Sequence, residues 1–167
     1  MLALPKALAR SGIALRADTP ADRPFLRALH AAARLDAPFI AQWPAAQREP
    51  FLDSQFQLQD LHYRRHHPRA DFLIVEQGGF AIGRLVLDRG AKDWTVVDIA
   101  LMPQNRGGGI GAAILGAVLD GARRAGVPVR LHVETGNRVR RLYERLGFRE
   151  VESEFNSHAA MVWDPLS

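Results

Sequence analysis

The segment at residues 104–111 reads QNRGGGIG, and four of its eight residues are glycine. Each glycine in regular structure lowers stability by about 0.5–1 kcal/mol relative to alanine, because it loses more conformational freedom on folding. The segment follows a strand-like run at 93–102 and precedes a helical pattern that Gly126 ends. The first-turn N–H groups of a helix lack partners within the helix, and peptide dipoles add positive potential there. This junction therefore predicts a loop whose main-chain amides can reach a phosphate or diphosphate.

This glycine-rich junction has three alternative interpretations. The first is an ordinary turn without a ligand. The second is a dinucleotide-binding fingerprint, which requires its glycines after the first strand of a βαβ unit. Gly107, Gly109 and Ala112 fit that spacing loosely, but the junction lies late in the chain, after strands joined by a hairpin. The third, a P-loop, is excluded because no Gly-Lys-Ser/Thr follows the glycines.

The rest of the chain predicts an α+β fold in one domain spanning residues 1–167. Alternating or continuous apolar runs favour strands, and apolar positions three and four residues apart favour helices. We expect a mixed central sheet of six to seven strands flanked by about four helices, with parallel pairing only around the last helices. Pro50 is expected near the start of the second helix. The expected strands are 12–16, 71–77, 80–88, 93–102, 127–134, 148–153 and 158–164; the expected helices lie within 19–35, 45–66, 110–126 and 137–147.

Composition limits the possible partners. No apolar run approaches the roughly 20 residues that cross a bilayer, so we expect a cytoplasmic protein with no membrane partner and no cleaved signal. The chain has no cysteine, which excludes an acyl-cysteine intermediate. Its net charge of +4 would suit an anionic ligand, but the arginines occur singly or in pairs. A nucleic-acid partner is therefore not expected.

Two segments together resemble a known enzyme family. The first is VVDIALMPQNRGGGIGAAILGAVLDGARRAG, and the second, VRLHVETGNRVRRLYERLGFREV, follows it directly after two residues. They resemble the acyl-coenzyme A binding core of the GNAT superfamily of N-acetyltransferases. The family motif [RQ]-x-x-G-x-[GA] matches Arg106, Gly109 and Gly111, and in an overlapping register Gln104, Gly107 and Gly109.

The resemblance implies acetyl-CoA as the co-substrate and assigns a set of binding residues. The fourth and fifth strands would splay apart to admit the pantetheine arm, which would pair with Ile99, Ala100 and Leu101 like an extra strand. Backbone amides of the loop would hold the pyrophosphate of coenzyme A. These amides belong to Arg106, Gly107, Gly108, Gly109, Ile110, Gly111 and Ala112.

The resemblance also implies catalytic roles. Tyr143 would protonate the departing thiolate, although an aromatic at this position could simply pack the helix on the sheet. Asn137 would contact coenzyme A or cap the helix that follows. An amine with a pKa near 10.4 is mostly protonated at pH 7, so a general base is needed. Asp98 and Glu134 are the candidates, unless both are surface carboxylates in salt bridges, and a strand amide near Leu101 would hold the oxyanion.

Several other polar residues have two interpretations. His62 and His66 are four residues apart and His67 follows, yet the pattern lacks the glutamate of a zinc helix, so no metal is expected. His132 alternates with Glu134 along a strand and could relay a proton. Two arginines in the last helix, at 140 and 141, could form a solvated face or meet the 3′-phosphate of coenzyme A.

We therefore expect an N-acetyltransferase that transfers an acetyl group from acetyl-CoA to a primary amine of a small molecule or protein. The transfer would be direct, within a ternary complex. The alternative is a catalytically idle acyl-CoA sensor or partner-binding module on the same fold. The acceptor would be shaped by residues 20–67 and by the loop at 152–157. Homodimers are common among relatives, so a homodimer is possible.

Overall fold

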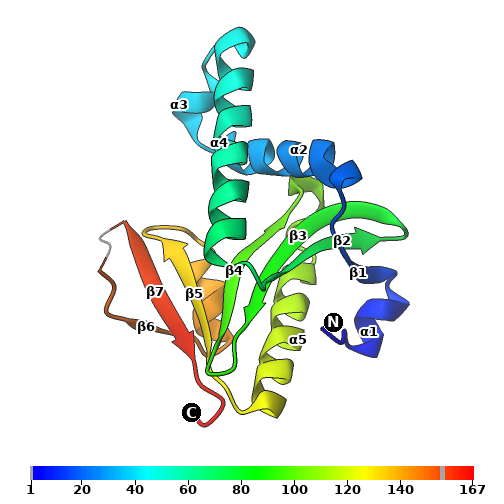
Figure 1. The fold of residues 1–167 in the computed structure, drawn as a ribbon, viewed down its shortest axis with the longest axis vertical. Coiled ribbons are helices and arrows are strands. Elements are labelled where there is room, and N and C mark those ends of the chain that lie inside the picture. The colour runs from blue at the N-terminus through cyan, green and yellow to red at the C-terminus, as the bar shows by residue number, and fades with distance from the viewer. Residues whose placement is uncertain (1, 155–156) are drawn as a thin grey trace.

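The structure is a computed structural model that describes residues 2–154 and 157–167. In these residues seven strands form one sheet, in the order β1-β2-β3-β4-β5-β7-β6, and six α-helices surround it (Figure 1). The strands are β1 (Ile13–Ala17), β2 (Asp71–Gln77), β3 (Phe80–Arg89), β4 (Trp94–Leu101), β5 (Val129–Glu134), β6 (Arg149–Val151) and β7 (His158–Trp163). The helices are α1 (Lys6–Arg10), α2 (Arg23–Arg34), α3 (Pro38–Ala41), α4 (Ala45–His66), α5 (Ile110–Ala125) and α6 (Arg140–Arg145).

The predicted α+β class and mixed sheet are confirmed. Strands β1 to β4 pair antiparallel, β4 and β5 pair parallel, and β5, β7 and β6 pair antiparallel again. The β2–β3 hairpin turns at Gly78 and Gly79, both with positive φ, as a two-residue hairpin loop requires. The parallel pair needs a long crossover, and α5 provides it. Among the described strands, parallel pairing therefore occurs only between β4 and β5, next to the last two helices, as expected.

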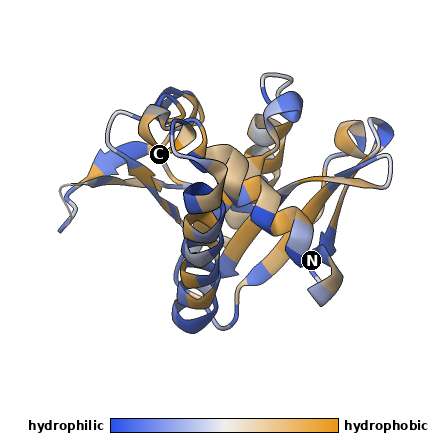
Figure 2. Ribbon diagram, turned by 90° about the horizontal axis from the view of Figure 1, so that it is seen from above, coloured by the Kyte–Doolittle hydropathy of each residue, from blue (hydrophilic) through white to orange (hydrophobic). Residues whose placement is uncertain are grey.

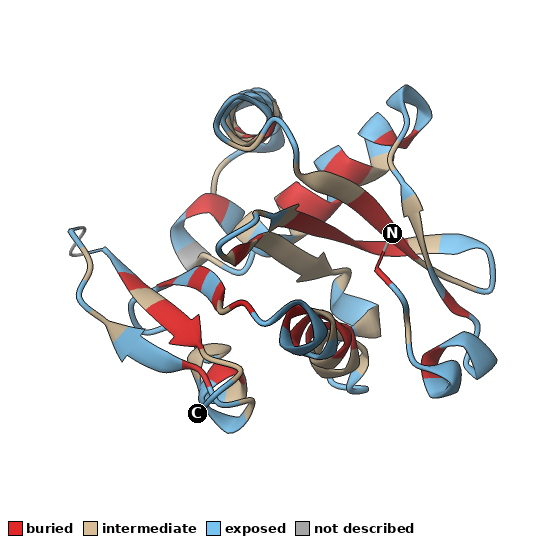
Figure 3. Cartoon of the chain, turned by 60° about the horizontal axis from the view of Figure 1, so that its bottom comes forward, coloured by how far each residue is buried: buried red, intermediate tan, exposed pale blue. Residues whose placement is uncertain are grey.

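Helices cover both faces of the sheet. Buried residues of α5, together with Leu2, Leu8 and Tyr143, pack on one face and form the larger core. Leu26 of α2 and Phe56 of α4 pack on the other face, against Ile74 of β2. Figure 2 shows apolar residues concentrated on the strands, and Figure 3 shows that buried residues lie mainly on the strands and on the inner faces of the helices. None of the helices in the described part of the chain has the length and apolar character to span a membrane.

Helix α4 differs from the sequence expectation. Pro50 lies inside the helix, which begins at Ala45. Proline removes one hydrogen bond from a helix interior, but this end of α4 extends beyond the sheet (Figure 1), where water can satisfy the carbonyl left unpaired. Leu58 and Leu61, part of the apolar pattern that predicted this helix, are 61% and 49% exposed. The two short helices α1 and α3 were not predicted, because five or four residues carry no readable period.

A β-bulge in β4 separates it from β5. The β3–β4 register shifts so that Asp98 lies opposite Val86 but Val96 lies opposite Leu87, which leaves Val97 as the extra residue. A bulge bends its strand and increases the local twist. The parallel pairing of β4 with β5 ends at Val96, the residue just before the bulge. Beyond this point the two strands diverge, as the family resemblance implies.

Candidate functional site

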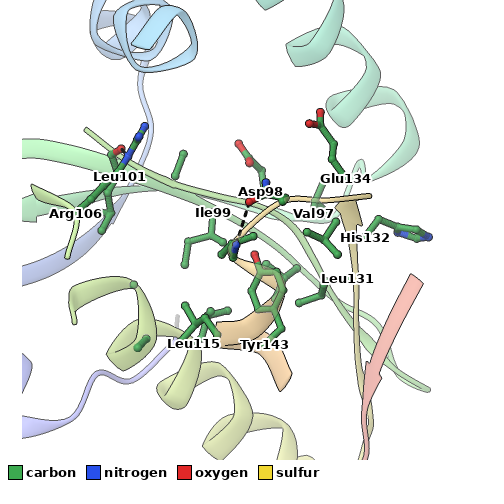
Figure 4. Close-up of a pocket in the computed structure, with 18 of the residues that line it drawn as sticks. Val97, Asp98, Ile99, Leu101, Arg106, Leu115, Leu131, His132, Glu134 and Tyr143 are labelled. Carbon is green, nitrogen blue, oxygen red and sulfur yellow. Dashed lines mark hydrogen bonds between the residues drawn. The ribbon is translucent and has the colours of Figure 1, made fainter. Parts of the chain in front are cut away.

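A cavity of about 1230 Å³ lies where β4 and β5 separate (Figure 4). Residues of α4, β4, β5, the glycine loop, the first turn of α5, and α6 line it. The structure thus brings together nearly all the site residues predicted from the sequence. Those lining the cavity are Asp98, Ile99, Ala100, Leu101, Arg106, Gly107, Gly109, Ile110, Gly111, Ala112, Glu134, Asn137 and Tyr143; Gly108 is the exception.

The glycine loop leaves its amides open. Gly107 and Gly109 have φ of 80° and 83°, a region that only glycine adopts without strain, and Gly109 is the N-cap of α5. The first hydrogen bond into the helix runs from the Ala113 N–H to the Gly109 carbonyl, at 3.0 Å. No described residue accepts a hydrogen bond from the N–H groups of residues 107–112. A Cβ added at residue 107, 108 or 109 would meet no atom within 4 Å, so the chain itself leaves space in front of these groups.

The backbone N–H of Arg106, unlike those of the residues that follow it, already has a partner within the chain. Its N–H donates to the Pro103 carbonyl at 3.2 Å, so the series of open amides begins one residue later, at Gly107. Its Nε donates to the Leu101 carbonyl at 3.0 Å, and its Nη1 forms an ion pair with Asp36 Oδ2 at 3.0 Å. The Arg106 side chain therefore ties the end of β4 to the loop that follows α2.

The outer edge of β4 presents backbone groups to the gap. The Met102 N–H donates to the Ile82 carbonyl of β3 at 2.8 Å. Because donors and acceptors alternate along an antiparallel strand, the backbone groups of Leu101 and Ile99 point away from β3, into the gap. The Leu101 carbonyl accepts a hydrogen bond from Arg106, whereas the Leu101 N–H has no partner among the described residues. Ala100 directs its backbone toward β3 and lines the cavity with its side chain.

Tyr143 is both a core residue and part of the cavity wall. It is 7% exposed and packs edge-on against Phe148, with ring centroids 5.8 Å apart. Burial, with a smaller contribution from the negative charge of Asp98, raises the pKa of Tyr143 to about 12. The phenol is therefore protonated throughout the physiological pH range. Tyr143 therefore packs in the core and also lines the cavity, and its role as the proton donor stays a prediction.

The two predicted carboxylates differ in their partners. Asp98 Oδ2 accepts two hydrogen bonds from Arg84, from Nε at 2.9 Å and from Nη2 at 2.6 Å. Glu134 is exposed and forms no ion pair with a described residue. In Figure 4 both carboxylates point toward the α4 side of the sheet, while Tyr143 approaches from the side of α5 and α6. The cavity is thus bordered by carboxylates on one face and by a phenol on the other.

The remaining predicted residues resolve as follows. Asn137 lines the cavity, and its Oδ1 accepts a hydrogen bond from the Val139 N–H at 3.0 Å, in the turn before α6; the N-cap of α6 is Val139, which has no side-chain cap. Arg140 pairs with Glu144 and Glu150 on an exposed face, which fits the solvated-face interpretation. Within the described residues, no three His, Asp or Glu side chains gather as a metal site would require. The loop expected to shape the acceptor, 152–157, includes residues 155 and 156, which lie outside the described residues.

A buried polar group on the α4 side of the cavity was not predicted from the sequence. Arg84 is 5% exposed, and its Nη2 also donates to Gln59 Oε1 of α4 at 3.0 Å. Tyr63 of α4 lies beside it, with the Arg84 guanidinium carbon 5.6 Å from the ring centroid. Gln59 and Tyr63 line the cavity. A signal was present in the sequence, because Arg84 is a lone charge within the apolar run of β3, where burial requires a partner.

The sequence matches a known protein family and a curated relative. Residues 33–148 match the model of the acetyltransferase (GNAT) family. The chain is 38% identical over 79 residues to the ribosomal protein bS18-alanine N-acetyltransferase of Haemophilus influenzae, a match that covers 47% of this chain and 51% of that protein. The chain thus spans about half the length of this curated relative.

Solved structures show the same fold. The PaiA N-acetyltransferase of Thermoplasma acidophilum, in complex with coenzyme A, aligns with a TM-score of 0.68 and 18% identity, over 91% of this chain and 98% of that one. The ribosomal-protein-S18-alanine N-acetyltransferase of Escherichia coli aligns with a TM-score of 0.59 and 21% identity, over 91% and 93%. Since the family model covers well over half of the chain and the fold agrees, the chain belongs to the acetyltransferase (GNAT) family, whose members are acyltransferases that take the acyl group from acetyl-CoA.

Proposed function

We propose that this chain transfers the acetyl group of acetyl-CoA directly to the N-terminal α-amine of a protein. The observation that carries the transferase assignment is the row of open amides at residues 107–112, facing a cavity that continues into the gap between β4 and β5. The protein acceptor is supported by the relative from H. influenzae, whose name specifies alanine of a ribosomal protein. A coenzyme A site fits these residues because anions bind at helix N-termini with free amides.

The donor would be held by backbone groups along its length. The amides of Gly107, Gly109, Gly111 and their neighbours would bind the pyrophosphate. The free backbone groups of Ile99 would hydrogen-bond the pantetheine arm, as an added strand does. The thioester would then lie in the β4–β5 gap, above Tyr143. In this position the Leu101 amide is the oxyanion donor expected from the sequence.

The proton transfers would be divided between the two faces of the sheet. The acceptor arrives as an ammonium ion and loses one proton to Glu134, which is exposed and can pass it to water. The amine nitrogen bonds to the thioester carbonyl carbon and the carbon–sulfur bond breaks. The sulfur takes a proton from Tyr143, which recovers it through water from the second amine proton. One proton is released for each acetyl group transferred.

An α-amine suits this arrangement chemically. With a pKa near 7.7–8.0, roughly one α-amine in ten is neutral at pH 7, against fewer than one lysine side chain in a thousand. Deprotonating the amine at pH 7 therefore costs about 1 kcal/mol for an α-amine and about 4–5 kcal/mol for a lysine, and the general base has to offset this cost.

Three probes test the proposal: a hexapeptide with a free N-terminal alanine, the same peptide with a blocked N-terminus and an internal lysine, and a small diamine. Each is incubated with the protein and acetyl-CoA while free thiol is followed. We expect thiol release with the first peptide, and mass spectrometry should place the acetyl group on its α-amine. Release with only the diamine would remove the protein acceptor. Coenzyme A binding without thiol release from any amine would favour the idle sensor, and no binding at all would end the proposal.

A further inference from the structure

Arg84 is buried at a position where an ion pair adds little to stability. It is 5% exposed, and its partner Asp98 is 23% exposed at the side chain. Removing two charges from water costs about as much as their attraction returns, so a well-packed apolar pair is often at least as stable. The Arg84–Asp98 pair is therefore poorly explained by stability alone.

The contacts of Arg84 hold the Asp98 carboxylate in one orientation. Register places Arg84 opposite Ala100 and Asp98 opposite Val86, so the two side chains are diagonal neighbours on the α4 face of the sheet. Both hydrogen bonds from Arg84 end on Oδ2 of Asp98. Gln59 Oε1 accepts a hydrogen bond from the same Nη2 at 3.0 Å, while Nη1 of Arg84 is buried and has no hydrogen-bond partner among the described residues. Oδ1 of Asp98 has no hydrogen bond from a described residue, and Asp98 lines the cavity.

From this geometry we propose that Arg84 is a positioning residue: it fixes Asp98 so that Oδ1 accepts a hydrogen bond from the acceptor amine and aims the nitrogen at the β4–β5 gap. This inference rests on the proposed function and refines the acceptor side of the same site. Asp98 then orients the amine, and Glu134, which has no ion pair with a described residue, removes the proton. Gln59 supports the arrangement from α4.

The test compares Arg84→Met with a matched control, Arg89→Met. Arg89 lies on the same strand, pairs with Asp71 at 2.8 Å, and lies over the ring of Trp94, but it does not line the cavity. Steady-state kinetics with the alanine hexapeptide are measured for each variant that keeps its circular dichroism spectrum. Coenzyme A affinity is measured by calorimetry.

For Arg84→Met we expect kcat/KM for the peptide to fall on the order of 100-fold, as misplaced reacting groups do, with a raised peptide KM. Coenzyme A affinity should stay within about 2-fold, because no open amide of the loop is touched. Arg89→Met should leave both values unchanged. A folded Arg84→Met protein with the wild-type peptide KM and kcat/KM would overturn the proposal, as would an equal loss in Arg89→Met.

A second variant covers the case in which Arg84→Met does not fold. Arg84→Lys keeps the charge beside Asp98 but lacks the planar fork of donors that fixes the carboxylate. We expect a folded protein with a peptide kcat/KM between wild type and Arg84→Met, or about 10-fold below wild type if Arg84→Met is lost. Wild-type kinetics in Arg84→Lys would refute a positioning role. Loss of thiol release by the wild-type protein itself would instead refute the proposed function.

Discussion

The chain has two tyrosines, and we predict that both ionise at a higher pH in the folded protein than in the unfolded chain. Burial raises the pKa of both Tyr63 and Tyr143 to about 12, from about 10 in an unfolded chain. No other tyrosine is present. The phenolate absorbance of the folded protein should therefore stay flat through pH 10 and rise near pH 12. After unfolding in denaturant, the same absorbance should rise near pH 10.

The same shifts predict a loss of stability in alkali. Because the folded state keeps each phenolic proton to a higher pH than the unfolded state, the stabilisation is complete below about pH 10 and falls as the pH rises from about 10 to 12. A pKa raised from about 10 to about 12 corresponds to about 2.7 kcal/mol for each tyrosine. Both tyrosines are largely buried, so the two together give a loss on the order of 5 kcal/mol.

The assay is an absorbance titration read beside circular dichroism, with Tyr143→Phe as the control. That variant should lose half of the phenolate signal, and its remaining tyrosine should still ionise near pH 12. Ionisation of both tyrosines near pH 10, with an unchanged circular dichroism spectrum, would refute the burial argument. It would also remove the reason for treating Tyr143 as a protonated phenol at neutral pH.

Three further perturbations address the proposed roles. Tyr143→Phe should lower kcat by about 10²–10⁴-fold with little change in coenzyme A affinity; equal kcat values would remove Tyr143 from proton transfer. Glu134→Gln should lower kcat for the alanine peptide by a similar factor, and recovery of its rate at high pH, where the amine is neutral, would identify the missing base. Gly109→Ala should cost about 1–2 kcal/mol in thermal unfolding, because φ there is 83°, and should also weaken coenzyme A binding. Gly111→Ala, in the first turn of α5 with Leu101 Cδ1 3.8 Å from the added Cβ, should stabilise the protein by about 1 kcal/mol and keep coenzyme A affinity; a loss of affinity would contradict the backbone-only role of this residue.

Local patterns in the sequence were sufficient for most of the fold. The two glycines at 78 and 79 form the hairpin turn between β2 and β3, because both adopt positive φ. Gly126 also has positive φ and ends α5. Residues 107–112 were predicted as a ligand loop because the flanking strand and helix determine where free amides lie. The features that were predicted depend on neighbours along the chain.

The features that were missed depend on contacts between distant segments. Arg84 and Gln59 are 25 residues apart, and only the packing of α4 on the sheet brings them together. The bulge at Val97 arises from the β3–β4 register, which the apolar pattern of β4 does not encode. Pro50 was placed near a helix start because proline disfavours helix interiors, whereas α4 extends past the sheet into solvent at this end. Arg106 was expected to offer its amide to a ligand, but this N–H donates to the Pro103 carbonyl instead.

The open amides of residues 107–112 are the basis for placing the pyrophosphate of coenzyme A in this loop. The most direct measurement is a coenzyme A titration followed by the backbone ¹H–¹⁵N resonances of the labelled protein. We predict that the signals of Gly107, Gly109 and Gly111, with those of their loop neighbours, shift most, and that they saturate together with the binding isotherm measured by calorimetry. If coenzyme A binds while these amide signals stay in place and other residues shift, the pyrophosphate lies elsewhere and the assignment of this loop is wrong.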